Sequence, residues 1–169
     1  MTQWETQNFA VDASLPTPLP PTTDIPGVQG TWVGTYGVDG YILGGWTTSG
    51  DLSSLPVGVT YSLEQGSRYT WASSTTDVRA LQTPDQTGRR STTWYDTTEV
   101  RVRLNFANPY SGTLHLYAVD WNAIGRAENV TVDDGTGPRT AALTSAFNNG
   151  AWVHVPITCL LYTSPSPRD

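Results

Sequence analysis

Short stretches of alternating apolar and polar residues recur along the chain from Gln29 onward, separated by turn residues at intervals of about 8 to 15 positions. The clearest stretch is VRVRLNF at residues 100–106, where Val100, Val102, Leu104 and Phe106 alternate with arginine and asparagine. Successive side chains of a strand point to opposite faces, so this alternation predicts a strand with one face on the core.

The same reasoning predicts further strands along the body of the chain. NPYSG at 108–112 and DDGTGP at 133–138 supply the Pro and Gly residues that tight turns between strands require. No helical period survives for more than a turn or two, so we predict an all-β, antiparallel domain. The predicted strands cover residues 31–36, 40–43, 60–64, 69–72, 100–106, 113–121, 128–132, 140–143 and 152–157.

The N-terminal part of the chain has a different composition. ASLPTPLPPTTDIPG at residues 13–27 places five prolines among Thr and Ser, which favours extended chain over a packed element. We therefore predict a disordered Pro-rich linker at residues 1–28, followed by the folded body at residues 29–158. One core is expected for a body of this size.

Composition and charge narrow the set of partners. Aromatic residues make up 11% of the chain and charged residues only 14%, a balance typical of β-structure. All basic residues are arginines, and the formal net charge of -6 would repel a phosphate backbone, so nucleic acid is not an expected partner. No apolar run approaches the roughly 20 residues that span a bilayer, and the first residues lack a secretory-signal pattern. We therefore expect no membrane partner.

Several stretches of the body carry a family resemblance. The body resembles galactose-binding-domain-like modules of the jelly-roll type, a group that includes many carbohydrate-binding modules and serves as accessory domains in large exported bacterial proteins. The resemblance implies an antiparallel jelly-roll β-sandwich, an extracellular or cell-surface location, and neighbouring domains of a longer chain as partners. The stretches are GTWVGTYGVDGY (30–41), GSRYTWASSTTDVRALQTPD (66–85), RRSTTWYD (89–96), SGTLHLYAVDWNAIGR (111–126), VTVDDGTGPRTAAL (130–143) and GAWVHVPI (150–157).

The C-terminal segment departs from this family. Modules of this type normally continue after a GAWVxxPI-like strand into two more strands, whereas CLLYTSPSPRD at residues 159–169 is similar, in one continuous frame, to translated transposon-end and adapter sequence from tagmentation libraries. We therefore expect a body that lacks its last strands, followed by a non-native tail at 159–169. The tail holds the only cysteine, so redox, metal-thiolate and lipid-anchor functions are not expected.

Catalytic signatures are absent from the sequence. It contains no G-x-S-x-G, no H-E-x-x-H, no P-loop and no Cys/His pattern, and no carboxylate pair stands out as a glycosidase site. The two histidines, His115 and His154, lie in alternating strands, where a structural role is more common than a metal or catalytic one. We therefore predict a non-catalytic protein.

Acidic turns leave calcium open as a structural cofactor. Asp120 and Asn122 lie around one predicted turn, with Glu128 just beyond it, and Asp133 with Asp134 begin another, so that oxygen ligands could converge as Ca²⁺ requires. Neither turn has EF-hand spacing, and acidic residues in turns usually cap their own backbone. Apart from this weak calcium site, no cofactor is expected.

Aromatic residues provide the candidate binding site. Trp32 and Trp152 lie in alternating strands and are predicted to be core, whereas Trp46, Trp71 and Trp94 flank polar segments. There an indole face can stack on a pyranose while polar neighbours bind its hydroxyls. The sequence thus predicts a carbohydrate-binding or adhesive accessory module, with a structural spacer that binds no ligand as the alternative. The candidate ligand-binding residues are Trp71, Arg79, Trp94, Tyr95, Arg89 and Arg90.

Overall fold

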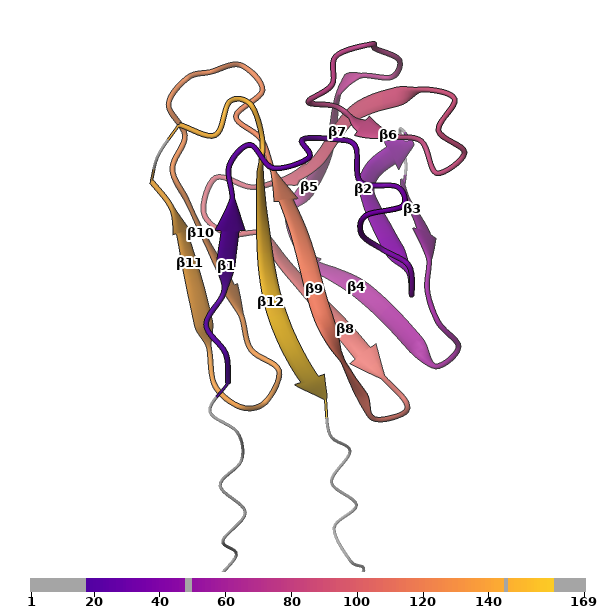
Figure 1. Cartoon of the computed structure of the whole chain (residues 1–169), viewed down its shortest axis with the longest axis vertical. Coiled ribbons are helices and arrows are strands. Elements are labelled where there is room, and N and C mark those ends of the chain that lie inside the picture. Colours follow the sequence, from indigo (N-terminus) through magenta and orange to yellow (C-terminus); the bar gives the residue numbers. More distant parts are fainter. Residues whose placement is uncertain (1–17, 48–49, 145, 160–169) are drawn as a thin grey trace, which may run out of the picture.

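The computed structural model describes residues 18–47, 50–144 and 146–159, and this part of the chain contains strands and no helix (Figure 1). All pairs of these strands are antiparallel, so the predicted all-β, antiparallel class is confirmed. The strands are β1 (Thr22–Asp24), β2 (Tyr41–Thr47), β3 (Gly50–Ser54), β4 (Val59–Gln65), β5 (Ser67–Ala72), β6 (Leu81–Gln82), β7 (Arg89–Tyr95), β8 (Arg101–Phe106), β9 (Tyr110–Ala118), β10 (Glu128–Val132), β11 (Arg139–Leu143) and β12 (Ala151–Cys159).

The described residues form five small sheets. The strand orders are β1-β12-β9, β10-β11, β2-β3, β4-β8 and β5-β7-β6. In Figure 1 the β1-β12-β9 sheet lies in the middle, between the β10-β11 hairpin on the left and β2 and β3 on the right. Among the described residues, no helix is long and apolar enough to cross a membrane.

β12 is buried on both faces, which explains its nearly continuous apolar sequence. Val153, Val155 and Ile157 point to one side and pack with Leu143 of β11 and Phe147, forming the larger core. Phe106 of β8 and the apolar residues of β10 border this core. The alternating faces that the sequence predicted for β8 and β10 therefore do meet a common interior.

The opposite face of β12 meets a second core, built mainly from indole rings. Trp152 packs there with Trp32, Leu43 and Trp46, and each of the four is at most 6% exposed. Buried indole nitrogens need an acceptor, and Trp152 Nε1 donates to the Gln29 carbonyl at 2.7 Å. The core positions predicted for Trp32 and Trp152 are confirmed. Trp46, which the sequence placed beside a polar segment as a possible stacking residue, is also buried in this core.

β2 lies against the sheet formed by β5 and β7, and glycine permits this close approach. A Cβ at Gly45 would come within 2.8 Å of the Thr93 carbonyl oxygen and 3.1 Å of that of Tyr69. Gly45 also has a φ of +65°, which side-chain-bearing residues rarely adopt. This contact sets the distance between β2 and the strands that carry the candidate site.

Most predicted strands occur within a few residues of their expected limits, but the one at 31–36 is wrong. Trp32 O accepts hydrogen bonds from the backbone amides of both Thr35 and Tyr36, and Gly34 has a φ of +83°, so this segment is a tight turn with a single bridge. Strands β3, β6 and β7 were not predicted. β1 lies inside the predicted linker at 1–28, and β12 includes Cys159, whereas residues 160–169 of the predicted tail lie outside the described residues.

Candidate functional site

Three aromatic side chains form a row on the outer face of the β5-β7-β6 sheet. The rings of Tyr69 and Trp71 meet edge to face with their centroids 5.3 Å apart, and Tyr69 meets Tyr95 in the same way at 5.9 Å. Tyr69 is 49% exposed and Tyr95 47%, and Trp71 is half-buried. Contiguous exposed apolar surface, unlike single exposed residues, often marks an interaction site.

The pairing of β5 with β7 brings these three rings together. Tyr69 and Trp71 are two positions apart on β5, and their rings are in contact although the register with β7 shifts between Thr70 and Ala72. Ser67 of β5 pairs with Tyr95 of β7, and Tyr69 pairs with Thr93, so Tyr95 is the diagonal neighbour of Tyr69 on the same face. We call Tyr69, Trp71 and Tyr95 the aromatic row.

The inner face of the same sheet is polar and centres on one carboxylate, Asp51 of β3. Its side chain is fully buried and accepts hydrogen bonds from Gly45 N at 2.7 Å, Trp94 Nε1 at 2.9 Å and Tyr61 Oη at 3.2 Å. Arg68 binds it through two nitrogens, each at 2.7 Å. We call this arrangement the Asp51 hub.

The Asp51 hub favours the ionised carboxylate. Burial by itself raises the pKa of the Asp51 carboxyl, but hydrogen bonds from Arg68, Gly45 and Trp94 outweigh it and hold this pKa below its usual value. Burial and then the Asp51 charge raise the pKa of the Tyr61 hydroxyl. The hub therefore joins β2, β3, β4, β5 and β7 around a single negative charge.

Trp94 and Tyr95 lie on opposite faces because they are consecutive residues of β7. The indole of Trp94 points inward to Asp51 and lies so close to β2 that a Cβ at Gly44 would come within 2.7 Å of it. Tyr95 points outward and belongs to the aromatic row. Of the aromatic candidates from the sequence, the structure brings Trp71 and Tyr95 together, with Tyr69 between them, and places Trp94 on the other side of the sheet.

The candidate arginines bond to groups of the chain itself. Arg79 pairs with Asp77 at 2.7 Å, donates to the carbonyls of Trp121 and Asn148, and lies 4.4 Å from the Trp121 ring centroid. Arg89 donates to the Ala80 carbonyl at 2.8 Å. Arg90 donates to the Trp46 carbonyl at 2.9 Å, and its guanidinium lies 5.5 Å from the Trp46 ring centroid. These arginines fasten loops to strands, and none is part of the aromatic row.

The calcium candidates also bond within the chain. Asp120 is buried, forms an ion pair with Arg126 and accepts a hydrogen bond from Gly125 N at 2.8 Å, whereas Asn122 is exposed. Asp133 caps the turn that follows it. In the described part of the chain, no group of three or more His, Cys, Asp or Glu residues is arranged to hold a metal ion.

Asp134, the fourth calcium candidate, connects a turn to the edge of β12. It pairs with Arg139 at 2.8 Å and accepts a hydrogen bond from Thr158 N at 2.8 Å. Burial by itself raises the pKa of the Asp134 carboxyl, but hydrogen bonds from Thr136 and Thr158 outweigh it, and the pKa lies below its usual value. The carboxylate of Asp134 therefore stabilises the edge of β12. A calcium ion at this position would have to compete with Arg139 and Thr158 for the same oxygen.

A second aromatic surface lies away from the row. It is a shallow apolar groove of about 260 Å³, bordered mainly by Trp32, Tyr36, Tyr41, Val38 and Pro84. Trp32 contributes little open area, because it is only 5% exposed. The groove is therefore the comparison site for any ligand assigned to the row.

Tyr69 is the member of the aromatic row that sequence reasoning missed. Its signal was present, since Tyr69 and Trp71 are separated by one residue in a predicted strand and must share a face. The register that adds Tyr95 was not predictable, because β7 itself was not predicted.

Comparison with known proteins identifies no relative. No protein-family model matches the chain, and no match was found among curated proteins or solved structures. The site geometry and the resemblance of the sequence to a known family are therefore the two grounds for assigning a function.

Proposed function

We propose that this chain is a non-catalytic carbohydrate-binding accessory module that holds its ligand against the aromatic row. The exposed, contiguous rings of Tyr69, Trp71 and Tyr95 are the observation that supports this function. Pyranose rings have apolar faces that stack on aromatic side chains, and hydroxyls at their edges that bind nearby polar groups. The exposed rings of the row offer apolar surface on which such a ligand can stack.

The wider setting is part of the same proposal. Its basis is the resemblance of residues 30–157 to galactose-binding-domain-like modules, which implies a jelly-roll sandwich in an exported, multidomain bacterial protein. Such folds serve many unrelated functions, so the fold class alone does not point to a sugar. The aromatic row adds a local reason for assigning carbohydrate rather than another ligand.

A glycan array followed by calorimetry tests this function. The chain is expected to bind at least one glycan, and Tyr69→Ala is expected to weaken that binding about 5- to 100-fold, which corresponds to roughly 1 to 3 kcal/mol for a lost stacking aromatic. Because Tyr69 is about half exposed in the free protein, the melting temperature of the Tyr69→Ala variant should differ little from that of the parent chain. Tyr95→Phe keeps the ring and should retain most of the affinity.

Two matched variants decide where the ligand binds. Val57→Ala removes an apolar side chain that is 98% exposed and lies outside the row, so it should leave affinity unchanged. Tyr41→Ala alters the apolar groove instead of the row. If affinity falls with Tyr41→Ala and not with Tyr69→Ala, the row is not the site. If the chain binds no glycan at millimolar concentration, carbohydrate binding is refuted.

The alternative function is a structural spacer that binds no ligand and positions neighbouring domains. One observation favours it: the guanidinium groups of Arg79, Arg89 and Arg90 already bond to groups of the chain, which leaves fewer polar partners for sugar hydroxyls. A negative glycan array together with a stable, monomeric chain would support the spacer.

A further inference from the structure

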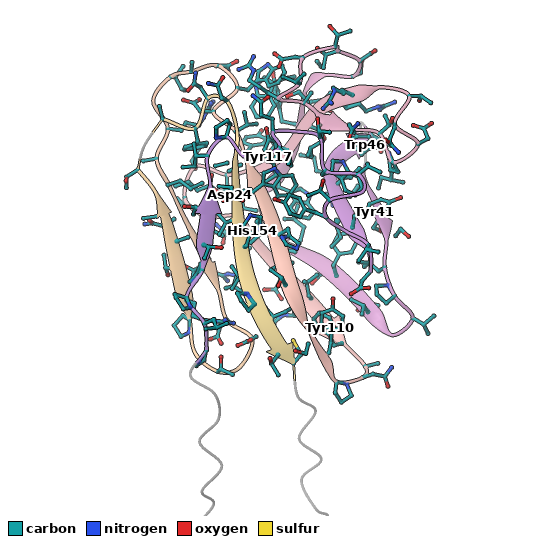
Figure 2. All side chains as sticks on the ribbon, in the orientation of Figure 1. Asp24, Tyr41, Trp46, Tyr110, Tyr117 and His154 are labelled. Carbon is teal, nitrogen blue, oxygen red and sulfur yellow. The ribbon has the colours of Figure 1, made fainter. Side chains whose placement is uncertain are left out.

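The two histidines of the chain face each other across neighbouring strands. His115 of β9 and His154 of β12 are direct partners in the strand register. Their Nδ1 atoms lie 2.6 Å apart, and the two rings meet nearly at right angles, with an interplanar angle of 73°. Figure 2 shows His154 near the middle of the molecule, beside Asp24. The chain has no other imidazole.

A carboxylate fixes the orientation of one ring. Asp24 Oδ2 of β1 lies 3.3 Å from His154 Nε2, so this nitrogen carries the proton that Asp24 accepts. A neutral His154 then has a lone pair at Nδ1, and His115 Nδ1 supplies the proton between the rings. The tautomers follow from these hydrogen bonds.

The surroundings hold this pair in place and leave it accessible. The ring of Tyr36 stacks on His115 with centroids 4.4 Å apart and an interplanar angle of 25°. The His154 side chain is 13% exposed and borders an open groove of about 400 Å³, together with Thr22, Thr113 and Pro156. Solvent ions can therefore reach the His154 ring through this groove, and His115 is half-buried beside it.

We propose that His115 and His154 form a binding site for a divalent first-row transition metal, with both Nδ1 atoms as ligands. Imidazole nitrogen suits Cu²⁺, Ni²⁺ and Zn²⁺, and affinities in this series peak at Cu²⁺. A carboxylate on the second nitrogen of a ligating histidine is the usual outer support of such sites, and Asp24 occupies that position. When the metal binds, the proton on His115 Nδ1 moves to Nε2, so both lone pairs face the ion.

Metal binding requires a local adjustment of both rings. With metal–nitrogen distances near 2.0 to 2.1 Å, two nitrogens in neighbouring corners of a tetragonal copper site are about 2.9 Å apart, so the two Nδ1 atoms need to separate by about 0.3 Å. Both rings must also turn, because the two Nδ1 atoms point toward each other in the hydrogen bond and must both point to the ion in the metal site. Because the described residues contain no group of three or more metal-binding side chains, solvent or an external ligand completes the coordination. The site thus remains open to a further ligand.

Titration of the tag-free chain with CuSO₄, followed by calorimetry and electron paramagnetic resonance, tests the site. One Cu²⁺ per chain is expected, with hyperfine coupling from two equivalent nitrogens. Because the chain has only two histidines, ¹⁵N-labelling of histidine alone should change that coupling pattern. An unchanged pattern, or the absence of saturable binding, would overturn the proposal. This readout on the parent chain does not depend on any variant folding.

Variants test which groups carry the affinity. His115→Phe keeps a ring against Tyr36 and removes the ligand, and it should abolish the 1:1 site. Asp24→Asn should weaken binding about 10- to 100-fold, since it removes the outer carboxylate. Cys159→Ser removes the only thiol and should leave binding unchanged. Retention of the site in a folded His115→Phe variant, or its loss in Cys159→Ser, would assign the metal to other groups and reject this proposal.

Discussion

At the scale of single residues, Asp51 is the centre of the polar contacts on the inner face of the sheet that carries the aromatic row. Its carboxylate is fully buried and accepts five hydrogen bonds, two of them from Arg68. Buried charges are tolerated only when they are paired and hydrogen-bonded. The hub meets this condition, so removal of its charge leaves several donors without an acceptor.

Asp51→Asn is therefore expected to lower the free energy of unfolding by about 2 to 4 kcal/mol, measured by urea denaturation. Glu99→Gln is the matched control, because the Glu99–Arg101 pair is more than half exposed on both sides and should contribute much less. Equal effects of the two substitutions would contradict the central role assigned to Asp51.

The Asp51 hub also predicts how stability depends on pH. An unfolded aspartate titrates near 3.9, and the folded pKa of Asp51 lies below its usual value, so protonation favours the unfolded chain. The contribution is fully present above the unfolded pKa and is lost as pH falls through the folded pKa. The free energy of unfolding should be measured at pH 7 and at pH 3 for both proteins. Its decrease from pH 7 to pH 3 should be smaller for Asp51→Asn than for the parent chain. A parallel loss in both proteins would argue against this mechanism.

Sequence reasoning reached part of the candidate site and could not reach the rest. It selected Trp71 and Tyr95, because aromatic rings beside polar segments can stack on a sugar while polar neighbours bind its hydroxyls. It could not separate Trp94 from Tyr95, since neighbours on a strand point to opposite faces and no pattern in STTWYD shows which face is inner. Only the hydrogen bond from Trp94 to Asp51 decides this, and it joins residues far apart in the chain.

At the scale of elements, the exposed edge of β12 is covered by two different means. β1 pairs with β12 only along residues 152–154. Beyond that point the Thr158 amide donates to Asp134, and the Pro156 carbonyl accepts from Arg139. Unpaired strand edges promote association between molecules, so these side chains protect a part of β12 that has no neighbouring strand on that side.

Arg139→Ala should therefore destabilise the protein and promote its association. The Asp134 side chain is 4% exposed and that of Arg139 10%, so loss of one partner leaves a buried charge, at a cost of about 3 to 5 kcal/mol. Urea denaturation measures the stability, and light scattering measures the association. Arg103→Gln, in the more exposed pair with Glu64, is the control and should change neither. Unaltered scattering of Arg139→Ala would show that the edge needs no such cover.

Strands were predicted correctly where apolar and polar residues alternate regularly. They were missed where the strand is short or its residues are mostly polar. β8 alternates regularly, and its limits were predicted to within one residue. By contrast, β7 reads RRSTTWY, a polar run whose inner residues bond to Asp51 and to β2 instead of packing in an apolar core. The segment TWVGTY was predicted to be a strand, yet the positive φ of Gly34 and its backbone hydrogen bonds make it a turn.

At the scale of the whole molecule, residues 18–28 contact the body that follows them. Figure 1 shows that the described chain enters and leaves at the same end, with β1 beside β12. Arg139 donates to the Leu19 carbonyl, and Val28 packs against the indole core. The Pro-rich composition predicted a linker here. Strand β1 could not be predicted, because its three residues show no periodicity of their own and depend on β12 for pairing.

The position of the domain boundary is therefore open to a direct test. A chain that begins at residue 29, the start of the predicted body, loses β1, its backbone pairing with β12 and the Asp24–His154 contact. A chain that begins at residue 18 keeps all three. The shorter chain should be less stable by at least about 1 to 2 kcal/mol, since each lost hydrogen bond contributes about 0.5 to 1.5 kcal/mol.

Thermal and urea unfolding of the two truncated chains measure this difference, and Thr22→Pro in the longer chain provides an independent check. Proline can neither donate to β12 nor adopt every strand geometry, so a substitution inside β1 should reproduce part of the loss if pairing is its cause. If the two truncated chains unfold at the same temperature, β1 contributes nothing to the body and the boundary belongs near residue 29. If only the shorter chain is destabilised and Thr22→Pro is not, packing of Val28 and the segment around it, rather than strand pairing, holds the N-terminus in place.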